Sequence, residues 1–356
     1  MKKHLAFVTG LFLLVLQNSI ACTTFFINKN GQLVFGRNYD WVSAAGMVCI
    51  NLVGLNKTSL KTGAGNTINW VSKYGSITFN QYGKEFPTGG MNEKGLVVEL
   101  MWADGSKYPK PDSRPVLGVL QWIQYQLDNN TTIDEVIATN AIIRISPNDP
   151  PLHYLVADAY GNAATVEFFN GKIVVHKGKD LPFPVLTNNP YSQSEKAADD
   201  ANVLSGNTNF SFRDNSLQRF TKACLMVQQY QLHDMKKPVV DYAFDILDNV
   251  AQKGFTKWSI VYDLKNRKIY FKTAEYPPVK SVTFHSFDFA CTSTAKVMDM
   301  NQLLQGDVDK NFKPFSNGAN RAITEQAVEE SKSQVPISDQ EKEALIAYAD
   351  AIKCKQ

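Results

Sequence analysis

The sequence predicts a layered α+β fold in one large domain. Predicted strands come in runs and predicted helices come in pairs between those runs, whereas a doubly wound sheet would alternate one strand with one helix. Apolar residues make up 44% of the 356 residues, which is ordinary for a globular chain with a large core. No internal repeat, low-complexity segment or break in composition divides residues 22–356. We therefore expect packed layers of sheet and helix in a single domain.

Strand patterns fall into groups that are bounded by turn-forming residues. The expected strands span residues 23–27, 32–38, 75–79, 95–102, 152–157, 163–169, 172–176, 258–264, 268–273 and 281–287. The turn at 28–31 makes the first two a hairpin, and Asn170-Gly171 joins two strands of a later meander. The segment 89–94 contains two adjacent glycines, so it is expected to connect the strand pair 75–79 and 95–102.

Helix patterns lie between these groups of strands. The expected helices span residues 116–127, 132–140, 216–232 and 240–253, and the polar tail from Asn301 is expected to be mostly helical. The second helix starts with Thr131 or Thr132 as its N-cap, followed by Asp134 and Glu135. Acidic side chains in a first turn favour a helix because they offset the positive end of its dipole.

The first 21 residues have the three parts of a secretory signal peptide. Lys2 and Lys3 precede an apolar run over 5–16, and Ser19-Ile20-Ala21 forms a small-x-small cleavage site. The run is shorter than the roughly 20 apolar residues that span a bilayer, so no stable membrane anchor is expected. Removal of 1–21 predicts a mature chain that a bacterium exports to the periplasm or secretes.

Cleavage after Ala21 would make Cys22 the first residue of the mature chain. An N-terminal cysteine carries both a thiol and an α-amino group, and this amine, with an unperturbed pKa of about 7.7–8.0, can take the thiol proton near neutral pH. Cys22 is therefore predicted to be the nucleophile of a hydrolase. Two alternatives remain open: a chance position near a cleavage site, and lipid attachment, although a lipoprotein signal usually has Leu where this chain has Ser19. A lipidated chain would be a non-enzymatic binding module, since an acylated amine cannot act as a base.

Charge and cysteine spacing exclude several classes of function. Loss of the leader leaves 35 basic and 34 acidic residues, so nucleic-acid binding is not expected. The five cysteines have no CxxC spacing, so no zinc site, other cofactor or dense disulfide framework is predicted. Cys224 lies on an apolar helical stripe and is expected to be a buried free thiol. No pairing partner can be assigned among Cys49, Cys291 and Cys354.

Five short blocks occur in order along the mature chain. They are Cys22-Thr23-Thr24, Phe35-Gly36-Arg37-Asn38-Tyr39-Asp40-Trp41, Gly90-Met91-Asn92-Glu93-Lys94-Gly95-Leu96, Leu186-Thr187-Asn188-Asn189-Pro190 and Arg219-Phe220. In this order they resemble the choloylglycine hydrolase family, which includes bile salt hydrolases and penicillin V acylases. The resemblance implies the four-layer αββα sandwich of the N-terminal nucleophile hydrolases, cleavage of a linear amide C–N bond, and a homotetramer.

The resemblance also implies a role for individual residues. Cys22 is the nucleophile and its amine the base, Arg37 favours the thiolate, and Asp40 orients the amine. Asn188 donates a hydrogen bond to the developing oxyanion, and Arg219 supports the polar network of the site. Four of these residues have an ordinary alternative when read alone. Arg37 could be a solvated strand arginine, and Arg219 an arginine at a helix edge in solvent. Asp40 and Asn188 could simply be turn-forming residues.

Trp102 departs from the family pattern. Ten residues after Asn92, bile salt hydrolases generally have asparagine and many penicillin V acylases have tyrosine, which contribute to the oxyanion hole. An indole has one donor and no acceptor, so this role would pass to the backbone amide of Trp102. The side chains of Trp102 and Trp41 would then form aromatic pocket walls; two core tryptophans are the alternative. Such walls are similar to those of Gram-negative penicillin V acylases, which are also linked to long-chain acyl homoserine lactones.

The predicted substrate is a small linear amide with an apolar or aromatic acyl group, and a conjugated bile salt is the alternative. A papain-type site is disfavoured because no cysteine-protease motif surrounds His153, His176, His233 or His285. A relative of the acid ceramidases is disfavoured as well, because those enzymes are split internally before the cysteine, whereas here the cysteine follows the leader at once.

Overall fold

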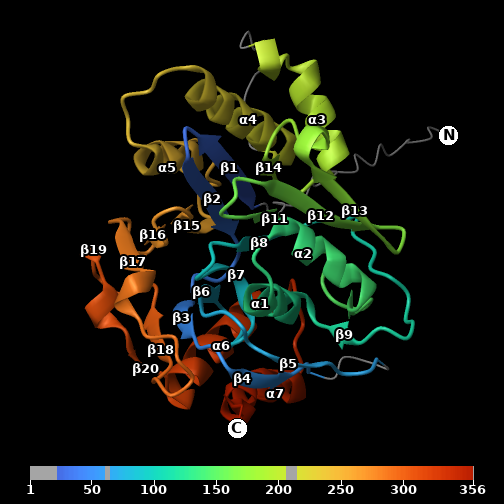
Figure 1. Cartoon of the computed structure of the whole chain (residues 1–356), viewed down its shortest axis with the longest axis vertical. Helices are drawn as coiled ribbons and strands as arrows, with labels where there is room; N and C mark the ends of the chain where they lie inside the picture. Colours follow the sequence, from blue (N-terminus) through green and yellow to red (C-terminus); the bar gives the residue numbers. More distant parts are fainter. Residues whose placement is uncertain (1–21, 61–64, 206–214, 356) are drawn as a thin grey trace, which may run out of the picture.

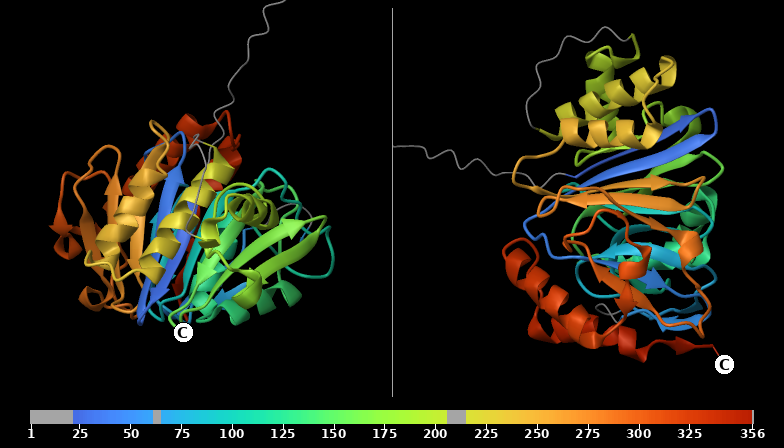
Figure 2. Two further views of the ribbon diagram at one scale, coloured as in Figure 1. Left: turned by 90° about the horizontal axis from the view of Figure 1, so that it is seen from above. Right: turned by 90° about the vertical axis from the view of Figure 1, so that its left-hand side faces the viewer.

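Two large β-sheets lie face to face, and helices cover the outer face of each (Figures 1 and 2). The structure, a computed structural model, describes residues 22–60, 65–205 and 215–355. Sheet A has seven strands, in the spatial order β14 (Val185–Leu186), β1 (Thr23–Lys29), β2 (Gln32–Asp40), β15 (Thr256–Asp263), β16 (Lys268–Thr273), β17 (Lys280–Thr283) and β19 (Gly306–Asp307).

Sheet B has nine strands and carries the second half of the core. Their spatial order is β13 (Lys172–Lys177), β12 (Ala163–Phe169), β11 (Leu152–Ala157), β8 (Val97–Trp102), β7 (Pro87–Asn92), β6 (Ser76–Asn80), β3 (Met47–Asn51), β18 (Lys296–Asp299) and β20 (Lys313–Pro314). A short parallel pair, β9 (Val116–Leu117) and β10 (Arg144–Ile145), lies outside both sheets.

Helices form the two outer layers. On sheet A, α4 (Ser216–Leu232) packs on β1 and α5 (Val239–Asn249) packs on β2, with α3 (Tyr191–Asp200) against α4. On sheet B, α1 (Val119–Asn129) packs on β7 and β8, and α2 (Ile133–Ala138) packs on β12. The right-hand view of Figure 2 shows these layers stacked. The order helix, sheet, sheet, helix confirms the predicted four-layer α+β sandwich.

Aromatic side chains fill the space between the sheets. The ring of Phe79, from β6 of sheet B, lies 6.1 Å from Tyr262 and 5.5 Å from Phe271, both from sheet A, in edge-on contacts. Between sheet B and its helices, Trp122 of α1 packs 4.4 Å from Tyr154 of β11. Aromatic pairs at these separations stabilise a core beyond the apolar area they bury.

Most of the predicted elements are confirmed, and several boundaries are corrected. The hairpin is β1–β2, the meander is β11–β12–β13, and α4 has the predicted bounds. The helix expected from residue 116 begins at Val119, after strand β9, and the one expected to reach residue 253 ends at Asn249. The strand expected over 281–287 ends at Thr283 and continues as a short 3-10 helix.

The segment 89–94 is not merely a connection, because Pro87–Asn92 is strand β7 and separates the two strands expected to pair. Its glycines are required by packing rather than by a turn. A Cβ on Gly89 would overlap the carboxylate of Glu99, and one on Gly90 would lie 2.7 Å from the carbonyl oxygen of Ile77. Both glycines therefore let a central strand pass a buried side chain and a neighbouring backbone.

The C-terminal region adds a helical unit to the sandwich, as expected for the tail. α6 (Asn317–Ser331) and α7 (Asp339–Ala351) pack on each other, and β21 (Lys353–Cys354) pairs with β4 (Leu55–Thr58), which pairs in turn with β5 (Asn69–Val71). A disulfide joins Cys291 to Cys354, with Cα atoms 5.7 Å apart. Cys224 is a buried free thiol, as predicted.

Candidate active site

Cys22 lies at the start of the β1–β2 hairpin and is buried, with 2% of its surface exposed. Its Sγ atom is 3.9 Å from the carbonyl oxygen of Asp40, the last residue of β2. On the other side β14 pairs with β1, and the register joins Thr24 to Leu186. Because these strands are antiparallel, continuing the register by two residues sets Asn188 opposite Cys22. Sheet A therefore brings three of the five sequence blocks to one place.

The Arg37 side chain reaches from sheet A into sheet B and is fully buried. Its guanidinium forms a 2.5 Å ion pair with Glu99 and donates to the carbonyl oxygens of Thr88 and Leu100, each at 3.3 Å. Gly89 and Glu99 are the outermost paired residues of β7 and β8, and Thr88 and Leu100 lie just beyond this pair, so the guanidinium occupies the point at which these strands separate. The interpretation of Arg37 as a solvated strand residue is wrong.

Burial opposes ionisation of both partners in this ion pair. It lowers the pKa of Arg37, but the combined negative charges of Glu99, Cys22, Tyr39 and Tyr262 raise it, and the guanidinium pKa lies above its ordinary value. Burial raises the pKa of the Glu99 carboxyl to about 7, against the opposite effects of Arg37 and of a hydrogen bond from Tyr262. The site therefore holds a permanent cation and an acid that titrates near neutrality.

The Cys22 thiol responds to the same charges. Burial raises its pKa to about 11, the positive charge of Arg37 lowers it, and the negative charge of Asp40 raises it. These values describe a chain in which Cys22 still follows Ala21. Freeing the amine would place a second positive charge on Cys22 itself, and a cation at that distance favours the thiolate.

Asp40 is fully buried at the end of β2. One carboxylate oxygen accepts a 2.5 Å hydrogen bond from the hydroxyl of Thr256, on β15. The backbone carbonyl oxygen of Asp40 lies 3.9 Å from Cys22 Sγ, and the negative charge of Asp40 raises the pKa of that thiol. A carboxylate held here can accept hydrogen bonds from an ammonium group on Cys22.

The Asn188 side chain has a fixed orientation. Its Nδ2 donates to the carbonyl oxygen of Trp102 at 2.8 Å, and its Oδ1 accepts from Nη2 of Arg219 at 3.3 Å. The hydroxyl of Ser216 also accepts from the backbone amide of Asn188 at 3.0 Å. Arg219 is fully buried, so the prediction that it joins the polar network is favoured over a solvent-exposed helix edge. One N–H of the Asn188 amide is used by Trp102, and the second can face a substrate.

The backbone of Trp102 faces the same space. Ala103 donates to the carbonyl of Pro151, so Ala103 is a hydrogen-bonded position of the β8–β11 ladder. Positions alternate in an antiparallel ladder, and the N–H and C=O of Trp102 therefore both point away from β11. That is the direction from which Asn188 approaches the Trp102 carbonyl.

The two predicted wall residues are in contact. The rings of Trp41, which directly follows β2 of sheet A, and Trp102, which ends β8 of sheet B, lie 6.0 Å apart with planes at 35°. Trp41 is 6% exposed, whereas Trp102 is only partly buried. The Trp41 indole donates to the hydroxyl of Tyr82 at 2.8 Å. The sequence prediction missed Glu99, Tyr262, Thr88 and Tyr82, which contact the predicted residues from distant strands and loops and form no local motif.

Two histidines of the disfavoured papain-type hypothesis, His153 and His176, are engaged elsewhere. Both ring nitrogens of His153 have partners, the carboxylate of Glu167 at 3.0 Å and the carbonyl oxygen of Thr187 at 2.6 Å. His176 lies 3.5 Å from the same carboxylate. His153 therefore has no free ring nitrogen with which to accept a thiol proton.

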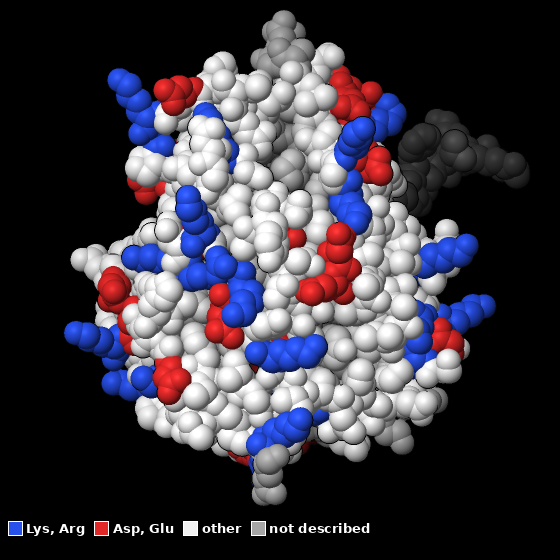
Figure 3. All heavy atoms as spheres, in the orientation of Figure 1, with Lys and Arg blue, Asp and Glu red and all other residues white. Residues whose placement is uncertain are grey.

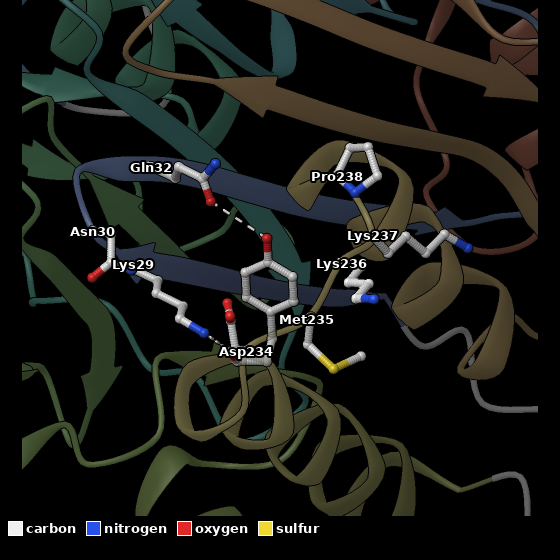
Figure 4. A pocket seen from close by; sticks show the side chains of 9 residues that line it. Lys29, Asn30, Gln32, Asp234, Met235, Lys236, Lys237 and Pro238 are labelled. Atoms are coloured by element: carbon white, nitrogen blue, oxygen red, sulfur yellow. Dashed lines mark hydrogen bonds between the residues drawn. The ribbon is translucent and has the colours of Figure 1, made fainter.

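A polar pocket of about 310 Å³ lies at the other end of the hairpin, between the β1–β2 turn and the segment after α4 (Figure 4). Since a strand rises about 3.3 Å per residue, Lys29 in this pocket is roughly 20 Å from Cys22. Its ammonium group donates to the carbonyl oxygens of Tyr230 and His233, so it is engaged in local structure. This pocket is not part of the candidate site.

Three wider properties bear on the site. On the face in Figure 3, basic side chains are interspersed with acidic ones, without a field of one sign. Within the described segments, no three His, Cys, Asp or Glu side chains come together as a metal site. Across residues 22–60, 65–205 and 215–355, every helix is too short or too polar to cross a bilayer.

Comparisons with known proteins agree with this geometry. The sequence model of the linear amide C–N hydrolases, choloylglycine hydrolase family, matches residues 22–199. A penicillin V acylase of Pectobacterium atrosepticum is 27% identical over 346 residues, covering 83% of this chain and 91% of that protein. The structure of a penicillin V acylase from Agrobacterium tumefaciens superposes with a TM-score of 0.73 at 25% identity, over 83% of this chain and 98% of that one.

A variant of the conjugated bile acid hydrolase from Clostridium perfringens superposes with a TM-score of 0.67 over 80% of this chain and 98% of that one. At 18% identity this likeness shows the shared fold. The family match begins at Cys22 and contains the Arg37, Asp40 and Asn188 blocks. The chain belongs to the choloylglycine hydrolase family of linear amide C–N hydrolases, and it is an amide-cleaving, acylase-type hydrolase.

Proposed function

We propose that this hydrolase removes an apolar or aromatic acyl group from a small linear amide, in the manner of a penicillin V acylase or an acyl homoserine lactone acylase. The observation that carries the proposal is the contact between Trp41 and Trp102 beside Asn188. A flat aromatic or alkyl acyl group gains contact area against two indole faces. The hydroxyl groups of a steroid would lose hydrogen bonds to water there.

The proposed reaction starts with cleavage after Ala21. The freed amine, held by Asp40, takes the Cys22 thiol proton, and Arg37 stabilises the resulting thiolate. The thiolate attacks the carbonyl carbon of the amide, and the protonated amine passes its proton to the leaving nitrogen as the C–N bond breaks. Water then attacks the thioester carbonyl carbon while the same amine accepts the water proton, the C–S bond breaks to release the carboxylic acid, and the ammonium returns its proton to the sulfur, which restores the thiol and the free amine.

The oxyanion of each tetrahedral intermediate would receive two hydrogen bonds. The second N–H of the Asn188 amide is one donor, and the backbone N–H of Trp102 is the other. Arg219 acts on Asn188 rather than on substrate, because its bond to Oδ1 keeps the amide nitrogen directed at Trp102. A preorganised donor of this kind contributes about 10²–10³-fold to the rate.

A substrate panel tests the proposal. The mature chain is assayed with penicillin V, a long-chain acyl homoserine lactone, glycocholate and taurocholate, in parallel with Cys22→Ala as a folded control. We expect turnover of at least one of the first two and none by the variant. Turnover of bile salts alone would overturn the proposed acyl preference, and normal turnover by Cys22→Ala would overturn the nucleophile.

We also propose export with removal of residues 1–21. The leader pattern and the Cys291–Cys354 disulfide support this, because disulfides persist in oxidising compartments. Intact-mass measurement of the native protein tests it: the expected mass is that of residues 22–356 with a free N-terminus and one disulfide. An added lipid mass would instead support the binding-module alternative. A homotetramer, implied by the family resemblance, is tested on the same sample by light scattering.

A further inference from the structure

A continuous hydrogen-bond chain connects the proposed acyl pocket to the C-terminal helical unit. The Trp41 indole lies 2.8 Å from the hydroxyl of Tyr82, in the loop between β6 and β7. That hydroxyl lies 2.9 Å from the hydroxyl of Ser331, the last residue of α6, 249 residues away in the chain. The Ser331 hydroxyl in turn lies 2.6 Å from the carbonyl oxygen of Ala327.

The chemistry of the groups fixes the direction of every hydrogen bond in this hydrogen-bond chain. An indole nitrogen only donates, so the Tyr82 oxygen accepts from Trp41. The single Tyr82 proton is then directed to Ser331, and the single Ser331 proton to the Ala327 carbonyl, which only accepts. All three side chains are buried. Removal of any member therefore leaves a buried polar group without its partner, which is the costly case for a hydrogen bond.

The backbone around Trp41 is held separately. The side-chain amide of Gln81 donates to the carbonyl oxygens of Ser43 and Ala45, at 3.2 Å and 2.6 Å. The segment after β2 thus keeps its path without Tyr82. The hydrogen-bond chain through Tyr82 and Ser331 acts on the indole itself. The Trp41 ring contacts Trp102, whose carbonyl binds Asn188, so a change in its tilt alters the space next to the reacting carbonyl.

We propose that Tyr82 and Ser331 are positioning residues for acyl recognition: they fix the Trp41 indole and so set the shape of the proposed acyl pocket beside Trp41 and Trp102. The substrate part of this inference rests on the proposed function. Helix α6, which follows both sheets in the sequence, thereby contributes to substrate selection although it supplies no residue to the reaction.

Tyr82→Phe is the main test, because it keeps the ring and removes only the hydroxyl. For an aromatic acyl amide such as penicillin V, we expect KM to rise about tenfold while kcat stays within about threefold, since the variant leaves the Cys22, Arg37 and Asn188 groups in place. Ser331→Ala, which removes the next member, should give a smaller rise in KM. An unchanged KM in both variants would overturn the proposal.

Tyr348→Phe is the matched control. Its hydroxyl donates to the carbonyl oxygen of Thr58 at 2.8 Å, so this variant removes one buried tyrosine hydrogen bond from α7 of the same helical unit. It should leave KM unchanged. A rise in KM equal to that of Tyr82→Phe would mean that general loosening of the C-terminal helices, and not the hydrogen-bond chain to Trp41, controls the pocket.

A second readout does not depend on turnover. The chain has five tryptophans, so labelling with 5-fluorotryptophan gives five ¹⁹F resonances, and Trp41→Phe identifies one of them. That resonance should shift in Tyr82→Phe and in Ser331→Ala but not in Tyr348→Phe. If no amide is cleaved, the proposed function fails, while the shift still supports control of the Trp41 indole by the hydrogen-bond chain. If that resonance does not shift in Tyr82→Phe and Ser331→Ala, the proposed control of the indole by the hydrogen-bond chain is overturned, whatever the activity.

Discussion

The buried pair of Arg37 and Glu99 allows a direct test of whether burial or ion pairing controls the site. Glu99 forms a 2.5 Å ion pair with Arg37 and accepts a hydrogen bond from the Tyr262 hydroxyl, yet burial raises its pKa to about 7. Glu99→Gln keeps the shape and the acceptor oxygen of the side chain and removes its ability to titrate. The variant therefore isolates the effect of the carboxylate charge.

The sign and size of the effect follow from the pKa. The carboxyl has a pKa of 4.5 in the unfolded chain and about 7 in the folded chain, so the folded state binds more protons between these values. Stability from Glu99 is fully present below pH 4.5 and is lost as pH rises through 7. At about 1.4 kcal/mol per pKa unit, the loss is about 3 kcal/mol. Glu99→Gln does not titrate and should lack this loss.

The assay is urea unfolding of both proteins at several pH values from 4 to 8. The free energy of unfolding of the variant, relative to wild type, should increase by about 3 kcal/mol across this range. A difference that is independent of pH, or one that changes in the opposite direction, would refute the reasoning. The opposite direction would mean that the attraction of Arg37 outweighs burial and that the folded-state pKa of Glu99 lies below 4.5.

Three further predictions concern other parts of the molecule. Asn188→Ala should lower kcat about 10²–10³-fold and change KM less, because the lost donor acts on the oxyanion; steady-state kinetics that show an unchanged kcat would contradict this role. Lys57→Met should lower the free energy of unfolding, measured in urea, by about 3–5 kcal/mol, because two buried carboxylates lose their shared cation. Lys237→Met is the control: this exposed lysine pairs with Asp245, and its loss should change the free energy of unfolding by less than about 1 kcal/mol. Equal effects of the two lysine substitutions would contradict it. Alkylation of Cys22 by iodoacetamide should accelerate with an inflection near pH 11 in a chain that keeps Ala21, and at lower pH in the mature chain, because the α-ammonium favours the thiolate; identical profiles would count against the amine as a partner of the thiol.

Elements with a strong local pattern were predictable from sequence. The β1–β2 hairpin, the meander and α4 each combine a clear period with turn-forming or capping residues, such as the Asn215 side chain that accepts from Gln218. Strand β7 was not predictable because Gly89 and Gly90 resemble a turn. Their purpose is visible only when Glu99 and Ile77 are placed beside them. Helix α3, which follows the Asn-Asn-Pro turn, was also missed.

The amino-acid sequence by itself determined the layered α+β class, the family and the residues to examine, because these depend on local patterns and on ordered blocks around Cys22. Tertiary structure alone decided which groups meet. Glu99 opposite Arg37, Arg219 on Asn188, Cys291 bonded to Cys354 and Tyr82 between Trp41 and α6 all join residues far apart in the chain. The physical reason is that a periodic pattern assigns a side chain to a face, whereas its partner and its pKa depend on which strands and helices the packed core brings together.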